Sequence, residues 1–285
     1  MIHFYFKNID FMKILFFFYH VIVIFLLLIS FYFKPISQWA LHGKNLFIKL
    51  EKGENENKSK IYKLKKKIDN IIIPKVYFLH FYIIGFVINS ILVFQDFYQN
   101  YINERRVFDF ISYTNIIFEI HLLRRLLEQL LVVRTTSKSF MHIFSYLLGI
   151  SFYMVTPFSL YNSDKNEYSK LNLISVILFL FGNLIQFDSH VRLAKLRPKD
   201  IRKNDVLYKV PYGGFFYYVS CPHYFAEILI YLSFFMLNTN FISLLNFVMV
   251  SLILIVNGLK THNWYIKILK DTYPKQRKAI FPFIL

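Results

Sequence analysis

The stretch PYGGFFYYVSCPHYFAE, residues 211–227, places reactive residue types in an apolar and aromatic setting. Its proline and its pair of glycines disfavour a helix and let the backbone approach another group closely. The apolar run that follows predicts a helix on which His223 and Glu227, four residues apart, share one face. A glutamate inside a membrane is costly unless it faces a polar site. The stretch therefore predicts the wall of a site inside a membrane-embedded enzyme.

A second polar set interrupts the apolar run FEIHLLRRLLEQLLVVR, residues 118–134. His121, Arg124, Arg125 and Glu128 follow helical spacing and form one stripe on an apolar helix. Charges in a bilayer are expensive unless they are paired or face a cavity. Two interpretations stay open, a structural Arg–Glu pair within a bundle and a site for an anionic ligand, and we favour the second.

Two further sets lie near the ends of apolar runs. In GNLIQFDSHVRLAKLR, residues 182–197, Gln186 and His190 share a helix face and Arg197 lies two turns further on. These residues suit either a membrane interface or the binding of phosphates, and the pattern does not separate the two. His262 and Tyr265 are three residues apart on the extension of the last apolar run. The aromatic tail that follows is predicted to fold back against the cytosolic face of the bundle.

Membrane spans must position these residues. The chain has 285 residues, 56% of them hydrophobic, and a mean hydropathy of +0.41, whereas soluble domains are about 45–50% apolar. Several apolar runs reach the roughly 20 residues that cross a bilayer. We predict an all-α, polytopic membrane protein with about seven transmembrane helices in one bundle. The predicted spans are residues 14–33, 76–95, 109–132, 140–160, 171–190, 215–237 and 241–258.

The charge distribution predicts orientation. The formal net charge is +17, and most of the 34 Lys and Arg residues lie in the loops 34–75, 133–139 and 191–212 and in the tail. Such an excess marks cytoplasmic segments, so we expect the C-terminus in the cytosol and the N-terminus in the lumen. No nucleic-acid-binding module accompanies the charge. A single cysteine excludes an internal disulfide and a multi-cysteine metal site.

Four segments together resemble the steroid 5-alpha-reductase family, and within it the polyprenol reductase branch. They are IPKVYFLHFYII, HLLRRLLEQLLV, GNLIQFDSHVRLAKLR with PYGGFFYYVSCPHYFAEILIY, and HNWYIKILKDTYPKQRKAIFPF. The resemblance covers the chain from about residue 71 to its end. Residues 1–70 are then an N-terminal anchor helix and a basic cytosolic loop, and residues 71–285 a membrane catalytic domain. The first segment indicates the polyprenol branch, because steroid-reducing members typically have Gln-Glu where this chain has His80-Phe81.

The resemblance implies a seven-helix bundle in the endoplasmic reticulum membrane, NADPH as hydride donor, and reduction of a carbon–carbon double bond. No G-x-G-x-x-G fingerprint is present, so the cofactor is implied by the resemblance alone. The positions that correspond to cofactor contacts in the family are Arg125, Arg134, Gln186, His190, Arg197, Tyr208, His223, Glu227, Asn257, His262 and Tyr265.

The chemistry of hydride transfer limits which substrates are possible. Hydride needs an electrophilic carbon, so the double bond must be conjugated to a carbonyl, which an allylic alcohol lacks. If the branch acts on polyisoprenoid lipids, polyprenal is favoured over polyprenol, and the product serves the dolichol pathway of protein N-glycosylation. The alternatives are a steroid or enoyl-thioester reductase on the same fold, which His80-Phe81 disfavours, and a membrane transporter whose buried charges line a substrate path.

For catalysis we predict His80, which lies mid-span among aromatic residues. Its imidazole could donate a hydrogen bond or a proton to the carbonyl oxygen as enolate charge develops. Steroid-reducing members place a tyrosine directly after the histidine of the third span, where this chain has Leu122. That departure removes a second donor. His121 either assists catalysis or orients a neighbour, and Glu227 is expected to contact the cofactor or pair with a cation.

Overall fold

A computed structural model of the chain describes residues 2–32, 71–103, 112–135, 139–161, 170–197 and 209–285. Within these ranges it has seven α-helices and one two-stranded sheet. The helices are α1 (Ile2–Tyr32), α5 (Phe78–Ile102), α6 (Tyr113–Leu131), α7 (Ile143–Leu160), α8 (Lys170–Lys195), α9 (Pro222–Leu237) and α10 (Phe241–Leu269). The strands are β1 (Ile72–Pro74) and β2 (Phe140–His142), and short 3-10 turns lie at Lys75–Tyr77, Gly214–Tyr217 and Lys270–Thr272.

Each predicted span overlaps one α-helix, which confirms the all-α polytopic class. Five helices, α1, α5, α7, α8 and α10, are long and apolar enough to cross a membrane. The other two depart from that pattern for different reasons. Helix α9 has only 16 residues, and α6 carries the charged stripe along its length. The count of seven crossings therefore stays a prediction.

The small sheet was not predicted. Strand β1 pairs antiparallel with β2, with Ile73 opposite Met141. The predicted span 140–160 therefore begins as strand, and α7 starts only at Ile143. The reason is local: His142 has extended backbone, and its ring Nδ1 accepts a hydrogen bond from the backbone N–H of Phe144 at 3.3 Å, which caps the helix. The sheet ties the start of α5 to the start of α7.

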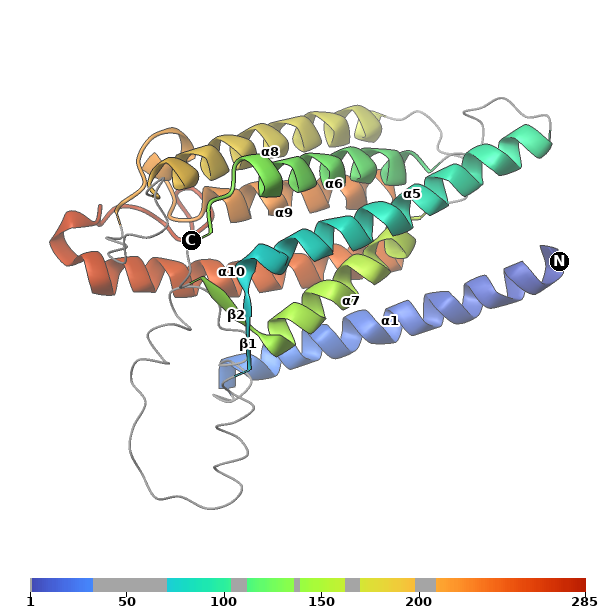
Figure 1. Ribbon diagram of the computed structural model, residues 1–285, viewed down its shortest axis with the longest axis horizontal. Coiled ribbons are helices and arrows are strands. Elements are labelled where there is room, and N and C mark those ends of the chain that lie inside the picture. Colours follow the sequence, from blue (N-terminus) through green and yellow to red (C-terminus); the bar gives the residue numbers. More distant parts are fainter. Residues whose placement is uncertain (1, 33–70, 104–111, 136–138, 162–169, 198–208) are drawn as a thin grey trace, which may run out of the picture.

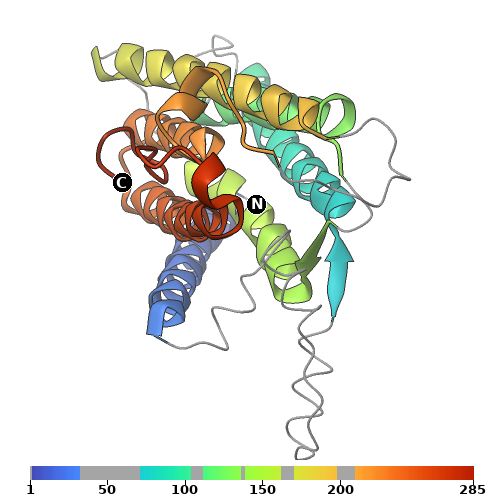
Figure 2. The same ribbon diagram turned by 90° about the vertical axis from the view of Figure 1, so that its left-hand side faces the viewer.

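The helices pack closely where glycines face side chains. A Cβ on Gly149 of α7 would lie 2.5 Å from the ring of Phe81 on α5, and one on Gly182 of α8 would lie 2.9 Å from the carbonyl oxygen of Ala226 on α9. Figure 2, an end view, shows α1 and α8 on opposite sides of the bundle. The largest buried cluster joins α5, α6, α7 and α9 through aromatic side chains, including Phe118 and Phe234, both fully buried.

Helix α9 begins later than the predicted residue 215 because the glycine pair forms a turn first. Gly213 and Gly214 have φ values of 90° and 53°, a region that favours glycine. The two glycines lie against an ion pair on α8, in which Arg192 Nε donates to Asp188 at 2.7 Å. A Cβ on Gly213 would collide with the guanidinium of Arg192. The turn fixes where α9 starts, and so where its polar face points.

The C-terminal tail folds back onto the base of α9, as predicted. The backbone N–H of Ser220 donates to the carbonyl of Lys278 at 2.8 Å, and that of Cys221 donates to Ala279 at 3.1 Å. Ile280 of the tail is fully buried. In Figure 1 the starts of α5, α7 and α9 and the ends of α6, α8 and α10 lie at one end of the bundle, which is the grouping of loops assumed in the charge argument.

Candidate active site

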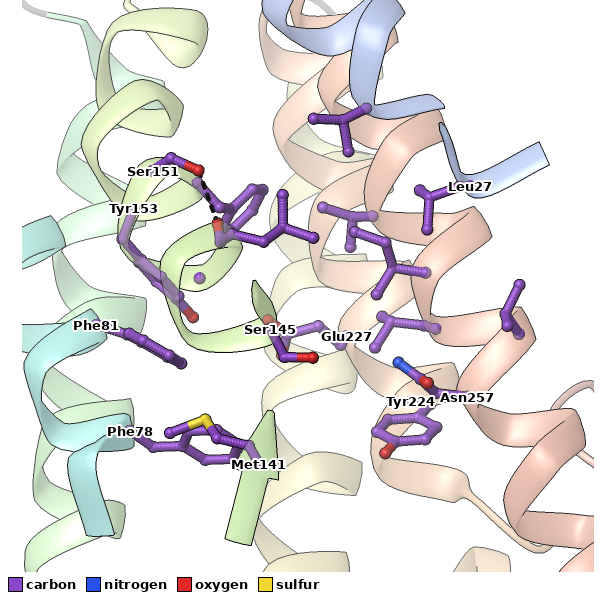
Figure 3. A pocket seen from close by; sticks show the side chains of 18 of the residues that line it. Leu27, Phe78, Phe81, Met141, Ser145, Ser151, Tyr153, Tyr224, Glu227 and Asn257 are labelled. Atoms are coloured by element: carbon purple, nitrogen blue, oxygen red, sulfur yellow. Dashed lines mark hydrogen bonds between the residues drawn. The ribbon is translucent and has the colours of Figure 1, made fainter. Parts of the chain in front are cut away.

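A cavity of about 910 Å³ lies inside the bundle and is lined by side chains from all seven helices. Figure 3 shows its interior, with Phe78, Phe81 and Tyr153 on one side and Tyr224 and Asn257 on the other. Ligand sites of drug-sized molecules are typically about 300–1,000 Å³. The cavity is therefore large enough for a substantial ligand.

One part of the cavity wall is polar. Six of the residues nominated from the sequence contribute to it: Arg125, Gln186, His190, His223, Glu227 and Asn257. They come from α6, α8, α9 and α10, so segments far apart in sequence converge here. The helical spacing of Gln186 with His190, and of His223 with Glu227, directs each pair to the same wall.

Glu128 organises the charges behind this wall. Its side chain is 2% exposed and accepts from Arg124 and from Arg125 Nη1 at 2.6 Å. His190 Nδ1 lies 2.8 Å from the same carboxylate and 2.9 Å from Arg125 Nη1. Both interpretations of the α6 stripe thus find support: a buried Arg–Glu pair exists, and Arg125 also lines the cavity. A carboxylate shared by several donors can hold them in fixed orientation in a medium of low dielectric.

A chain of hydrogen bonds connects this cluster to Glu227. Gln186 accepts from Arg124 and donates to Glu227. His121, fully buried, has its Nε2 3.5 Å from a carboxylate oxygen of Glu227. His121 is not one of the described residues that line the cavity. His121 therefore contacts the site through Glu227.

The donor set suits an anionic or amide-bearing ligand. Among the described side chains, the buried Nε–H groups of Arg124 and Arg125 have no hydrogen-bond partner. Buried donors of this kind are uncommon unless a ligand or water pairs with them. The amide of Asn257 also lines the cavity and could bind a carboxamide, whereas the amide of Gln186 is already bonded to Arg124 and Glu227. A nicotinamide dinucleotide fits this combination of cations and amides.

The rest of the cavity wall is apolar. It includes Ile22, Val23, Leu26 and Leu27 of α1 together with side chains of α7 and α10. Tyr19 of α1 is hydrogen-bonded to Ser151 of α7 at 3.0 Å, the contact drawn as a dashed line in Figure 3. Helix α1 is thus a wall of the cavity, a role for which the first 70 residues gave no motif.

Sequence reasoning missed three tyrosines in the cavity wall, Tyr82, Tyr153 and Tyr231. They come from α5, α7 and α9 and lie close enough to one another to interact electrostatically. Tyr82 also accepts a hydrogen bond from Arg125. No spacing distinguishes them in a chain with 21 tyrosines and 34 phenylalanines. Only their position relative to the charged cluster separates them from the other aromatic residues.

Like His121, the nominated residues His80, His262 and Tyr265 lie outside the cavity lining. His80 Nδ1 is 2.8 Å from the hydroxyl of Tyr146, and its ring stacks on Tyr77. His262 Nδ1 is 2.6 Å from Ser220 Oγ, and Tyr265 stacks on Tyr273 with ring centroids 5.2 Å apart. The latter two support the folded tail. Their predicted contacts with a cofactor stay predictions.

Arg134 and Arg197 lie together at the end of the bundle where α6 and α8 finish. Arg134 donates to the carbonyl oxygen of Arg197 at 3.3 Å, and Arg197 donates to that of Arg134. Each guanidinium thus bonds the backbone carbonyl of the other arginine, which brings two cations to one end of the bundle, where guanidinium donors suit a phosphate. The remaining nominated residue, Tyr208, lies outside the described residues.

Comparison with known proteins shows the family of the chain. Residues 128–285 match the family described as 3-oxo-5-alpha-steroid 4-dehydrogenase. A polyprenal reductase of Saccharomyces cerevisiae is 34% identical over 80% of this chain and 81% of its own length. A polyprenal reductase of Danio rerio is 30% identical over 75% of this chain and 80% of its own. One of Arabidopsis thaliana, polyprenal reductase 1, is 27% identical over 74% of this chain and 81% of its own. The chain belongs to the 3-oxo-5-alpha-steroid 4-dehydrogenase family, the steroid 5-alpha-reductases.

Proposed function

We propose that this protein reduces the α-isoprene double bond of polyprenal with NADPH, giving dolichal on the route to dolichol for protein N-glycosylation. Relatives that align with most of the chain are polyprenal reductases. The observation that carries the proposal is one cavity with two chemically different parts, a wall of cations and amides and a wall of aliphatic and aromatic side chains. The first suits a dinucleotide and the second a polyisoprenoid.

NADPH would supply the hydride. Arg125, Gln186, His190, His223, Glu227 and Asn257 would hold the nicotinamide half, since these side chains line the polar wall. Arg134 and Arg197 would bind phosphate where they meet at the bundle end. Tyr208, His262 and Tyr265 complete the proposed set on the basis of the family resemblance. The wall excludes water from the reacting carbons with side chains such as Phe81 and Tyr153.

The catalytic histidines take different positions in this proposal. His121 orients Glu227, because its Nε2 lies 3.5 Å from that carboxylate. His80 would have to leave Tyr146 and turn toward the cavity to reach a carbonyl oxygen, since its ring now pairs with that hydroxyl. A role of His80 as donor, the prediction from the sequence, would therefore require a side-chain movement.

The membrane setting follows from the helices and the substrate. Five helices suit a bilayer, and a polyisoprenoid substrate is itself a membrane lipid. We place the protein in the endoplasmic reticulum membrane with its C-terminus in the cytosol, where NADPH is available to the bundle end that carries Arg134 and Arg197. The positive charge of that end supports this orientation.

Isotope transfer tests the reaction directly. Purified protein in detergent micelles would be given polyprenal and NADPH deuterated at the transferable position, and the product analysed by mass spectrometry and NMR. We expect dolichal with one deuterium on the carbon β to the carbonyl. Deuterium on the carbonyl carbon would show alcohol formation instead. Absence of label from any product would favour a steroid substrate, and then the transporter alternative.

A further inference from the structure

Tyr82 occupies the junction between the charged cluster and the aromatic wall of the cavity. It lies on α5, is 5% exposed, and lines the cavity. On one side its hydroxyl accepts a hydrogen bond from Arg125 Nη2, and the guanidinium carbon lies 4.9 Å from the ring centroid. On the other side its ring meets that of Tyr153 edge to face at 5.5 Å.

The hydrogen bond with Arg125 fixes the direction of the tyrosine hydroxyl. A guanidinium group has donors and no acceptor, so the oxygen of Tyr82 must accept. The phenolic proton is then left to donate elsewhere. Among the described residues, Arg125 is the one side chain hydrogen-bonded to this hydroxyl, and the ring lies in the cavity wall. A carbonyl oxygen in the cavity is a suitable acceptor.

We propose that Tyr82 is the acid that donates to the aldehyde oxygen of the substrate during hydride transfer. The inference rests on the proposed polyprenal reduction. It assigns a donor where the family positions have none: Leu122 replaces a tyrosine and Phe81 a glutamate, and both are buried in the apolar core. Tyr82 supplies a phenol one residue after Phe81 on α5.

The step balances in atoms and charge. Hydride from the nicotinamide donor forms a bond to the β-carbon, the carbon–carbon π bond breaks, and its electrons move through the carbonyl to the oxygen. Tyr82 transfers its proton to that oxygen and becomes a phenolate beside the guanidinium of Arg125. The α-carbon then takes a proton from water, and the enol returns its proton to Tyr82. The net change is addition of one hydride and one proton.

Arg125 makes this acid effective and distinguishes Tyr82 from its neighbours. The guanidinium that contacts Tyr82 is anchored by Glu128 at 2.6 Å. A cation at the phenol oxygen stabilises the phenolate, and a preorganised charge is worth more in a water-excluded site. The hydroxyl of Tyr231, by contrast, is buried without a hydrogen-bond partner among the described side chains. Arg125 is therefore a positioning residue, and Tyr82 is the catalytic one.

Kinetics of matched variants provide the first test. Tyr82→Phe removes only the hydroxyl and should lower turnover of polyprenal by about 10²–10⁴-fold, the usual contribution of an acid–base group, with NADPH binding by fluorescence titration retained. Tyr98→Phe makes the same change on the exposed face of α5 and should leave turnover unchanged. A loss of that size in Tyr231→Phe or His80→Ala, with Tyr82→Phe near normal, would overturn the assignment.

A spectroscopic measurement separates failure of this inference from failure of the proposed function. Polyprenal carrying ¹³C at the aldehyde would be bound with NADP⁺, which cannot reduce it, and its carbonyl stretch followed by infrared difference spectroscopy. For the wild type and Tyr98→Phe we expect a carbonyl stretching frequency lower than that of polyprenal in protein-free micelles. For Tyr82→Phe the frequency should return toward the value in protein-free micelles. An identical bound frequency in Tyr82→Phe would refute the role of Tyr82 alone. No protein-bound carbonyl in the wild type would refute polyprenal as the ligand, and both proposals with it.

Discussion

Glu128 shows how a single buried carboxylate can hold a site together. Two arginines and a histidine from α6 and α8 converge on its side chain, which is 2% exposed. Arg125 connects it to Tyr82, and Arg124 connects it through Gln186 to Glu227. Buried ion pairs contribute little net stability, but removing one partner leaves uncompensated charge. The orientation of the polar side chains in the cavity wall thus depends on Glu128, which lies behind that wall.

Glu128→Gln tests this dependence. The substitution keeps the shape and removes the charge, leaving two arginines without a carboxylate partner, so unfolding should become easier by about 3–5 kcal/mol. Thermal denaturation in detergent, without cofactor, would measure the loss. The control is Asp188→Asn, which breaks an ion pair whose side chains are 43% and 37% exposed and should cost less than about 1 kcal/mol. Equal effects of the two changes would contradict the structural role of Glu128.

For individual residues, the sequence was a good guide to which side chains face a site. It was a poorer guide to the role of each side chain there. Helical spacing and family resemblance together nominated Arg125, Gln186, His223 and Glu227, all of which line the cavity. Periodicity assigns a residue to a face of its own helix but says nothing about the residue opposite. Tyr82 was missed for that reason, and His80 was nominated without knowledge that Tyr146 pairs with it.

Among the elements, α9 depends most on its surroundings. Its polar residues reach the cavity because the helix starts at Pro222 after the Gly213–Gly214 turn, against the Asp188–Arg192 pair of α8. The sequence predicted the break in the helix from these glycines, but placed the start of the span at residue 215. An apolar run does not reveal that its first residues form a 3-10 turn instead of an α-helix.

Gly213→Ala tests the turn. Its φ of 90° strains any residue that carries a Cβ, and such strain costs about 1–3 kcal/mol. The Arg192 guanidinium that the Cβ would meet is the end of a flexible side chain and can shift. We expect a lower midpoint of thermal unfolding than for the wild type. In an Arg192→Ala background the same substitution should cost nearly as much, because the backbone strain remains. No loss of stability in either background would mean that the turn rearranges freely.

For the whole molecule, the positions of the helices along the chain were largely predictable and the enclosed cavity was not. Apolar run lengths predicted where α5, α7, α8 and α10 lie along the chain, because crossing a bilayer sets a minimum length. The contribution of α1 could not be foreseen, since its contacts with α7 and α10, such as His20 with Asn246, are long-range. Membrane orientation is a property of the whole chain and stays a prediction.

Glycosylation tests that orientation. The sequon Asn57-Lys58-Ser59 belongs to the loop predicted to face the cytosol, which lies outside the described residues, so it should stay unmodified in microsomes. A tag carrying a sequon fused ahead of Met1 should be glycosylated, because the N-terminus is predicted to be luminal. Mobility shifts with and without a glycosidase would report both. A glycan on Asn57 would reverse the orientation, and with it the side from which NADPH enters.

The most direct test of the account compares two substrates that differ only at the carbonyl. Purified protein in micelles would receive NADPH with either polyprenal or polyprenol. Chromatography would then separate lipids with a saturated α-isoprene unit from those in which it is unsaturated. We predict that polyprenal is reduced to dolichal while polyprenol is unchanged. Only the aldehyde makes the double bond electrophilic, and only its oxygen takes up negative charge that Tyr82 can neutralise. Reduction of the free alcohol at a comparable rate would contradict both the conjugated substrate and the need for a donor at its oxygen.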